Sequence, residues 1–452
     1  MVTASPTRNA LLVGSVALIT LAAFENIAVT TVMPVVLSTL GGVELYALAM
    51  GLPLAAHVLA TAGGGIWVDA RSLRGPLLAG VAAFAAGLAV AGAAPDMGVV
   101  AAGRGVSGLG SGLMVVSLYA AVGRLAAPAD QPRYFAAFSV AWVIPGLVGP
   151  VIAGYLAQHA SWRWVFLGVV PFVAAAAIPV FALVRAVPAP EHPAAVVSRM
   201  RRTLLPAALV AVGIAMLQSD VVATPWLAAA GLVLVIAFLP RLLPPGTFAL
   251  RRGVPAVIAT RLLLNGVVIA IESYLTLYLQ RERGWEPGPA GLVLTVGSVT
   301  WALGSIYQGR VTDPQRRHRV AVAGAAMVAL GTAVTAVVLI PGVPAATAVV
   351  GWTVAGMGIG MTFASMAVLA LRFTPVERHG EISSALQIAD GAGAALAIAL
   401  FGATFNTLLD TAVNPYAPGF LAMVALAVLA VVAVSRVPKL TAATRPSAPA
   451  TH

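Results

Sequence analysis

Five ionisable side chains lie inside long apolar segments, and they are the residues of this sequence best able to do chemistry. They are Glu25, Arg104, Arg261, Glu272 and Asp390. A charge at the centre of a bilayer costs about 2.5–3.5 kcal/mol on insertion scales, so each of them needs a partner, a water-filled cavity or a function. A buried carboxylate can bind a proton, and a neighbouring arginine favours its ionised form. A carboxylate among the five that lies near an arginine could therefore take up and release a proton inside a membrane.

The composition requires a membrane around these residues. The chain has 452 residues, of which 60% are hydrophobic and only 9% charged, and its mean hydropathy is +0.97. A water-soluble domain has about a quarter of its residues charged. The apolar runs lack the alternation of transmembrane strands, so we expect an all-α polytopic membrane protein.

Fourteen apolar spans follow one another along the chain, each close to or above the ~20 residues that a helix needs to cross the hydrocarbon. They are 11–37, 45–68, 75–94, 98–123, 134–157, 162–187, 203–219, 222–243, 254–280, 287–309, 319–340, 344–371, 381–405 and 416–436.

The basic residues predict how these spans are oriented. Most of the 26 Lys and Arg residues fall in alternate gaps between spans, whereas the other gaps hold few, among them Arg163, Arg281 and Arg283. By the positive-inside rule, the basic gaps and both termini are cytoplasmic. The net charge of +11 is then explained by topology and lipid contact, and no nucleic-acid partner is expected.

Two basic, Pro-containing stretches divide the spans into groups of six, two and six. We expect a six-helix bundle over 1–187, a cytoplasmic linker over 188–202, an extra two-helix hairpin over 203–243, a second linker over 244–253, a six-helix bundle over 254–436 and a disordered cytoplasmic tail over 437–452. The short span 203–219 is the weakest element, since a helix lying in the interface would also fit it.

The two six-helix groups share a weak repeat. Gly65 and Asp69 end the second span, and Gly309 and Asp313 end the second span of the later group, each followed by basic residues. Parallel halves of this kind are typical of transporters that bind their substrate at mid-membrane.

With these features the chain resembles the major facilitator superfamily, in particular its fourteen-helix drug:proton antiporter branch. The stretch from Gly65 to Arg74 is similar to the G-x-x-x-D-R-x-G-R-R signature of a gating loop, but Ala70 and Ser72 replace the first Arg and the Gly. The run that begins Arg104-Gly105 is similar to R-x-x-Q-G-x-G, with Ser107 in place of Gln.

The fifth span carries the motif that the resemblance associates with antiporters. It contains Gly146, Gly149, Pro150 and Gly154, similar to G-x-x-x-G-P-x-x-G-G with its first Gly shifted by one. The resemblance implies two six-helix bundles that rock around a central site, and small residues at this spacing let helices approach closely.

Glu25 and Arg104 are expected at the same depth. At ~1.5 Å per residue, Glu25 lies about 21 Å above the cytoplasmic end of its span and Arg104 about 9 Å below the outer end of its own, which coincide in a core of about 30 Å. We expect Glu25 to bind the coupling proton and Arg104 to bias it, and the resemblance supports this, although the family usually has Asp there. The alternative is a static ion pair that joins two helices.

The other polar groups have less specific roles. Glu272 and Asp390 are expected to carry a second proton or attract a cationic substrate, or else to line a wet cavity. Arg261 is near the cytoplasmic end of its span, where snorkelling is expected. His57 is either a proton relay or a hydrogen-bonded structural residue, and Asn26, Asn265 and Gln387 are expected as donors in the substrate cavity.

Several functions lack a sequence basis. No phosphate-binding Gly-Lys-Ser/Thr loop is present, His and acidic residues show no metal-site spacing, and Cys is absent. We therefore expect no enzyme, no metal and no cofactor, with a proton gradient as the energy source, although sodium is not excluded.

The sequence thus predicts a monomeric transporter of the inner (plasma) membrane that exports hydrophobic or cationic small molecules among membrane lipids by alternating access. Export of a lipid or an endogenous amphiphilic metabolite, proton-coupled uptake, and a membrane protein without transport activity remain as alternatives.

Overall fold

The computed structural model describes residues 6–70, 73–125, 131–184, 194–218, 224–311, 313–374 and 379–438, and these residues form helices and no strand. The first group of helices is α1 Pro6–Leu40, α2 Tyr46–Ala70, α3 Arg74–Gly92, α4 Met97–Leu125, α5 Gln131–His159, α6 Arg163–Leu167 and α7 Val169–Val184. Then follow α8 Ala194–Leu217, α9 Pro225–Leu242, α10 Val254–Arg281, α11 Pro287–Gly309, α12 Pro314–Ala336, α13 Ala346–Arg372, α14 His379–Asn406 and α15 Ala417–Ser435. Short 3₁₀ helices, η1 Val43–Leu45 and η2 Val337–Leu339, precede α2 and follow α12.

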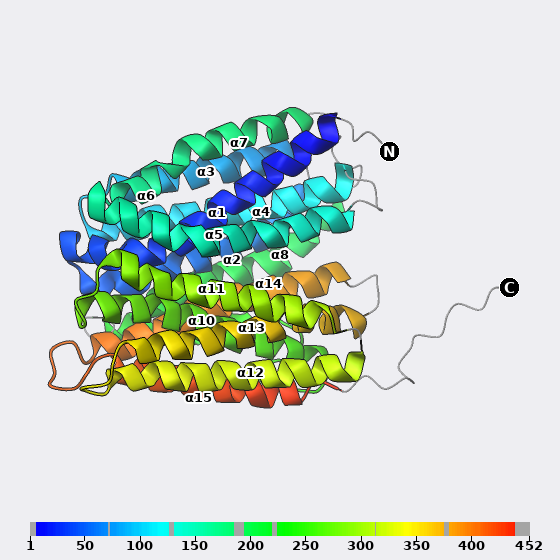
Figure 1. Ribbon diagram of the computed structural model, residues 1–452. Coiled ribbons are helices and arrows are strands. Elements are labelled where there is room, and N and C mark those ends of the chain that lie inside the picture. The colour runs from blue at the N-terminus through cyan, green and yellow to red at the C-terminus, as the bar shows by residue number, and fades with distance from the viewer. Residues whose placement is uncertain are drawn as a thin grey trace.

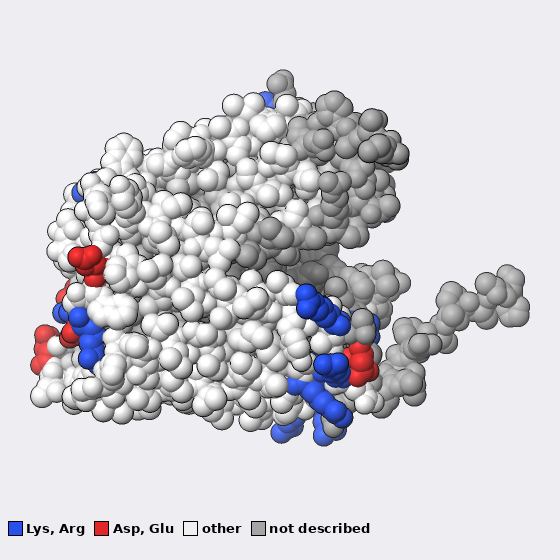
Figure 2. Space-filling model, in the orientation of Figure 1, with Lys and Arg blue, Asp and Glu red and all other residues white. Residues whose placement is uncertain are grey.

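The long helices run roughly side by side between two ends of the molecule (Figure 1). We call the end where α1 begins and α15 ends the basic end, because it carries Arg74, Arg124, Arg310, Arg316, Arg372 and Arg436. The opposite end carries acidic and basic residues together: Glu44, Asp96, Arg163, Arg281, Glu282, Arg283, Glu286 and Asp410. On the face drawn in Figure 2 the charges gather at the two ends, with more blue than red at the basic end, and almost none lie on the wide surface between them. The uncharged surface is what a hydrocarbon environment requires.

Twelve helices in the described part of the chain are long and apolar enough to cross a membrane, and Leu204–Leu217 is a shorter apolar helix. The protein is therefore an all-helical, multi-pass membrane protein, as predicted. The helix bounds agree closely with the expected spans because an apolar run of this length has no other way to satisfy its backbone in lipid. Whether all fourteen spans cross remains a prediction.

The clearest departure from the expected bounds is at α8. This helix begins at Ala194, inside the stretch predicted as a linker over 188–202. Hydropathy does not detect its basic first turns, although Ala, Met and Arg are good helix formers. The side chains of 194–203 and of Asp69, the loop residues 71–72 and the tail from residue 439 lie outside the described residues.

Helices α1–α7, the first half, and α10–α15, the second half, pack in the same pattern. In the first half α4 packs on α2 and α3, and α1 on α5 and α7; in the second half α13 packs on α11 and α12, and α10 on α14 and α15. This correspondence pairs α2 with α11 and α5 with α14, as expected for a repeated unit.

Two seams join the halves: α2 packs against α14, and α5 against α11. Because α2 corresponds to α11 and α14 corresponds to α5, the contact of α2 with α14 is the equivalent of the contact of α11 with α5. The helices α8 and α9 form a hairpin whose described residues pack on one of these seams, through contacts of α8 with α2 and α14.

Candidate functional site

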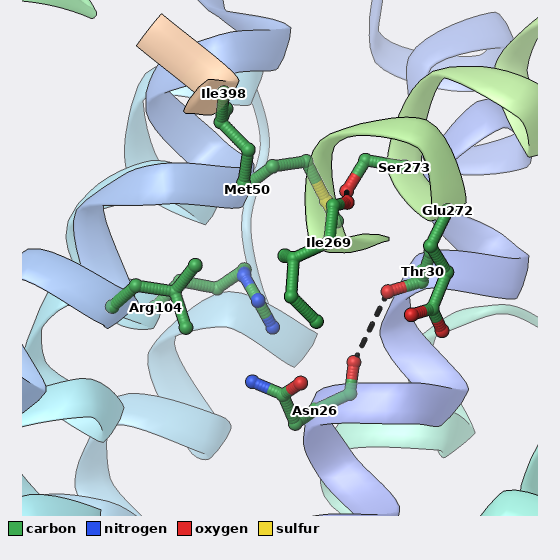
Figure 3. A pocket seen from close by; sticks show the side chains of 9 residues that line it. Asn26, Thr30, Met50, Arg104, Ile269, Glu272, Ser273 and Ile398 are labelled. Carbon is green, nitrogen blue, oxygen red and sulfur yellow. Dashed lines mark hydrogen bonds between the residues drawn. The ribbon is translucent and has the colours of Figure 1, made fainter. Parts of the chain in front are cut away.

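A small polar pocket lies between the halves near the middle of the bundle. It is lined by Asn26, Thr30, Met50, Leu54, Arg104, Ile269, Glu272, Ser273 and Ile398, which come from α1, α2, α4, α10 and α14. Figure 3 shows the guanidinium of Arg104 on one side of the pocket and the carboxylate of Glu272 on the other. Its volume of about 10 Å³ is close to the minimum for one water molecule. The pocket therefore has room for about one water molecule between the charged groups of Arg104 and Glu272.

Arg104 connects three helices at this pocket. Its Nη1 donates a hydrogen bond of 2.6 Å to Oε1 of Glu25 on α1, and its Nε donates one of 2.8 Å to the backbone carbonyl of Ala49 on α2. That carbonyl is available because Pro53, four residues later, has no N–H to bond with it. The proline in α2 thus supplies an acceptor that fixes the arginine.

The pairing of Glu25 with Arg104 was predicted from their depths, and the structure confirms it. The two side chains are 7% and 2% exposed. Removing one partner of an ion pair this buried strongly destabilises a protein, because the other charge stays buried and uncompensated. The geometry shows a close pair; whether it carries a proton remains a prediction.

Glu272 faces the same pocket from the second half. In contrast to Glu25, its carboxylate forms no ion pair within the described part of the chain. The pocket is therefore lined by the arginine of an ion pair from one half and, from the other, by a carboxylate without an ionic partner among the described residues.

Hydrogen bonds between the two halves gather on the side of this pocket toward the opposite end. Tyr46 donates to the Ser273 carbonyl at 2.8 Å, and Gln280 to the Thr31 carbonyl at 2.9 Å. The Thr276 hydroxyl lies 3.3 Å from the Thr30 carbonyl, an acceptor that Pro34 leaves free four residues later, and it lies closer to two carbonyls of its own helix.

At the opposite end itself, Asn406 donates to the Glu44 carbonyl at 3.0 Å, and Gln158 to the Glu286 carboxylate at 2.9 Å. Aromatic packing adds to this contact, because Tyr46 packs edge-on against Tyr274, with 5.3 Å between ring centroids. The halves are thus joined from the pocket to the opposite end.

A second ion pair, partly buried, lies within the second half. Arg261 donates to both carboxylate oxygens of Asp390, with 2.9 Å from its Nε to Oδ1. Its guanidinium carbon also lies 3.2 Å from the ring centroid of Phe363, and its Nη1 donates to the Phe363 carbonyl at 3.1 Å. The expectation that Arg261 snorkels to the interface is therefore wrong. The packing of α10 on α14 brings Asp390 to it, a contact that depth along one helix does not reveal.

The predicted cavity donors divide into two groups. Asn26 lines the pocket. His57 lies within hydrogen-bonding distance of Ser111, 3.0 Å from Nδ1 to Oγ, Asn265 donates to the Asp390 backbone carbonyl at 2.8 Å, and Gln387 is exposed. These three do not line the pocket.

The glycine motif of α5 lies at the seam with α11. A Cβ on Gly154 would come within 2.8 Å of the Gly288 backbone, and one on Gly146 within 2.9 Å of the Ser298 hydroxyl. Gly149 and Pro150 are buried between them, and Gly149 faces Phe24 of α1. These small residues therefore permit a close approach of the two halves.

The motifs at the basic end have local geometry only. A Cβ at Gly65 or Gly309 would meet no atom of the described residues within 4 Å. Asp313 caps α12 by accepting a 2.8 Å hydrogen bond from the Arg316 amide, and Arg74 is exposed. Their expected gating role remains a prediction.

Sequence reasoning missed the backbone carbonyls in the site. Ala49 and Thr30 act through their carbonyl oxygens, so their side chains give no signal. The signal was the proline four residues later, Pro53 and Pro34, inside apolar helices.

The fold, with two similar halves around a buried charged pocket, is that of a secondary transporter. Residues 15–398 match the family model of the Major Facilitator Superfamily, as do residues 262–451, and the chain belongs to this family. Membership indicates a transporter rather than an enzyme.

Among curated relatives, a probable multidrug-efflux transporter of Mycobacterium tuberculosis is 26% identical over 415 residues, which are 88% of this chain and 87% of that protein. The acurin A biosynthesis cluster transporter of Aspergillus aculeatus is 25% identical over 66% of this chain and 57% of its own length. The assignment to the fourteen-helix branch remains a proposal.

Solved structures with the same fold are more distant in sequence. An auto-inhibited peptide transporter of the POT family has a TM-score of 0.70 at 15% identity, covering 97% of this chain and 99% of that one. A bacterial homologue of the lysosomal transporter Spinster has a TM-score of 0.66 at 15% identity, covering 96% of both chains. These similarities show the fold alone.

Proposed function

We propose that this protein is a proton-coupled exporter of hydrophobic or cationic small molecules that works by alternating access between its two halves. The observation that carries the proposal is the buried pair of Glu25 and Arg104 beside a pocket that Glu272 faces from the other half. The names of its relatives, which include multidrug-efflux transporters, support the substrate class.

The ion pair suggests how a proton is coupled to movement. A buried carboxylate keeps its charge while an arginine pairs with it, and it takes up a proton when that partner moves away. Arg104 is on α4 and also bonds to α2, whereas Glu25 is on α1. A displacement of α1 relative to α2 and α4 therefore changes the affinity of Glu25 for a proton.

The unpaired carboxylate suggests how a substrate is attracted. Glu272 is on α10 of the second half and borders the pocket without a cationic partner among the described residues. A lipophilic cation that enters as the halves separate would supply that partner. Competition between this cation and a proton for the same charged pocket is the proposed basis of exchange.

The distribution of charge supports an orientation. We propose that the basic end is cytoplasmic, by the positive-inside rule, and that the protein resides in the inner (plasma) membrane as a monomer. The hydrogen bonds between the halves then close the outer side, so substrate enters from the cytoplasmic side. We also propose that the chain divides into a six-helix bundle (1–187), a two-helix hairpin (203–243) and a second six-helix bundle (254–436), with both termini cytoplasmic.

The proposal is tested in liposomes that contain the purified protein and a trapped pH dye. We expect tetraphenylphosphonium to evoke a proton flux that protein-free liposomes do not show and that persists when sodium is replaced by potassium. A flux that requires sodium would contradict proton coupling. If no lipophilic cation evokes flux while a fluorescent lipid is transferred between leaflets, the protein exports lipid instead.

A further inference from the structure

The hairpin of α8 and α9 is attached to one seam only. Its two helices cross where Gly213 and Gly231 face each other, since a Cβ on either would come within 3 Å of the other's backbone carbonyl. Helix α8 follows α2, with Leu204 against Gly63 at one level and Gln218 against Gly51 at another. The hairpin therefore lies along α2 where α2 meets α14.

Gln218 reaches from the end of α8 into the seam itself. Its side chain is buried, and its Nε2 donates a 2.9 Å hydrogen bond to the backbone carbonyl of Ala395 on α14. On the other side it fills the space beside Gly51 of α2, where a Cβ would overlap the amide. One side chain thus touches both halves of the transporter.

A buried amide at this place needs an explanation, because a polar group inside a membrane is costly. The Oε1 of Gln218 has no hydrogen-bond partner among the described residues. An amide that only anchored the hairpin to α2 would not need to bond to α14. The contact is suited instead to holding α2 and α14 together.

The equivalent seam has no such element. At the contact of α5 with α11, Thr295 of α11 donates directly to the Leu147 carbonyl of α5 at 3.3 Å, and no described segment of the hairpin packs there. Because the two seams correspond in the two halves, the Gln218 contact is an addition made by the hairpin.

We infer that Gln218 is a latch: the hairpin inserts its amide between Gly51 and Ala395 and thereby stabilises the state in which the halves are closed at the opposite end. When α2 separates from α14 there, the amide keeps its place beside Gly51 and loses the Ala395 carbonyl. The hairpin therefore biases the equilibrium between closed and open states without contacting the pocket. This inference concerns conformation only and does not depend on the proposed substrate or on proton coupling.

The experiment uses the natural absence of Cys from the chain. Ala93→Cys and Thr407→Cys place two spin labels on exposed positions of the first and second half at the opposite end. Their distance distribution is measured by pulsed electron paramagnetic resonance in nanodiscs. The backgrounds are otherwise wild type, Gln218→Leu, Gly51→Ala and, as the matched control, Val233→Ala on the exposed face of the same hairpin.

We expect Gln218→Leu to raise the ratio of long-distance to short-distance populations about two- to tenfold, the effect of removing one buried hydrogen bond. Gly51→Ala should shift the ratio in the same direction, because the methyl group displaces the amide, whereas Val233→Ala should leave it unchanged. The latch is overturned if Gln218→Leu and Gly51→Ala both leave the ratio unchanged, or if Val233→Ala shifts it equally. If Gln218→Leu does not fold, Gly51→Ala against Val233→Ala decides alone.

Discussion

Among the described residues, each half of the molecule contains one ion pair inside its membrane-spanning helices, and the two pairs differ in how firmly they are held. The carboxylate of Asp390 accepts two hydrogen bonds, both from Arg261, whose guanidinium also lies against the ring and carbonyl of Phe363. Glu25 receives one bond, from one nitrogen of Arg104. A bidentate ion pair must break two hydrogen bonds to separate, so it resists separation better than a pair joined by a single hydrogen bond does.

The two ion pairs also differ in their position relative to the pocket. Arg104 borders the pocket between the halves, whereas neither Arg261 nor Asp390 lines it. We interpret the pair of the first half as the one that opens during transport and the pair of the second half as a structural clamp between α10 and α14. The comparison teaches that burial of a charge does not by itself identify the working site; position and number of contacts do.

The largest effect is expected from Glu25→Gln. The amide keeps the shape of the side chain and still accepts a bond from Arg104, but it cannot carry a proton. We expect accumulation of substrate against its gradient to be lost, while exchange of labelled for unlabelled substrate at equal pH continues. Both are measured on the same liposomes. Loss of exchange as well as accumulation would show that Glu25 is needed for binding or folding rather than for coupling.

The second-largest effect is expected from Asp390→Asn, on the stability of the protein. Asp390→Asn leaves Arg261 buried without a charged partner, and removing one member of a buried pair costs about 3–5 kcal/mol. We expect a clear drop in the thermal unfolding midpoint in detergent, with transport per folded molecule largely kept. The double variant Arg261→Met with Asp390→Leu should recover much of the midpoint, because it removes both charges. No recovery would contradict the role of a clamp.

Glu272→Gln should have a smaller and selective effect. Because its carboxylate has no ionic partner among the described residues, its neutralisation should weaken transport of lipophilic cations and leave neutral substrates unchanged. The check is the apparent affinity for tetraphenylphosphonium against that for an uncharged dye. Equal loss for both would remove the role in cation recognition.

The smallest effect is expected from His57→Gln. His57 contacts Ser111 and does not line the pocket, and a single side-chain hydrogen bond contributes about 0.5–1.5 kcal/mol. We expect proton flux to be unchanged and the unfolding midpoint to fall slightly, as for Ser111→Ala. A loss of flux in His57→Gln alone would instead indicate a proton relay.

The helices were predictable from the sequence because an apolar run in a membrane has one stable local structure. The meeting of Glu25 with Arg104 was predictable as well, since depth along a helix follows from counting residues. The pair of Arg261 with Asp390 was not, because it depends on how α10 rotates against α14. Small residues such as Gly266, whose Cβ would meet the Gly393 backbone within 3 Å, fix that contact.

The role of Gln218 was not predictable for a related reason. In the sequence it marks only the polar end of a short apolar span. Its contact with the Ala395 carbonyl exists because the hairpin lies over one seam, and the position of the hairpin is set by packing between segments far apart in the chain. Local sequence patterns specify elements, whereas the pairing of their faces requires the assembled structure.

The most direct test of the central claim compares the two ion pairs in one assay. Substrate-evoked proton flux is measured for wild type, Glu25→Gln and Asp390→Asn in matched liposomes and normalised to the amount of folded protein. We predict no flux above the protein-free background for Glu25→Gln and near-normal flux for Asp390→Asn. Persistent flux in Glu25→Gln would contradict the account. If flux persists in Glu25→Gln and is lost in Asp390→Asn, the coupling proton belongs to the second half.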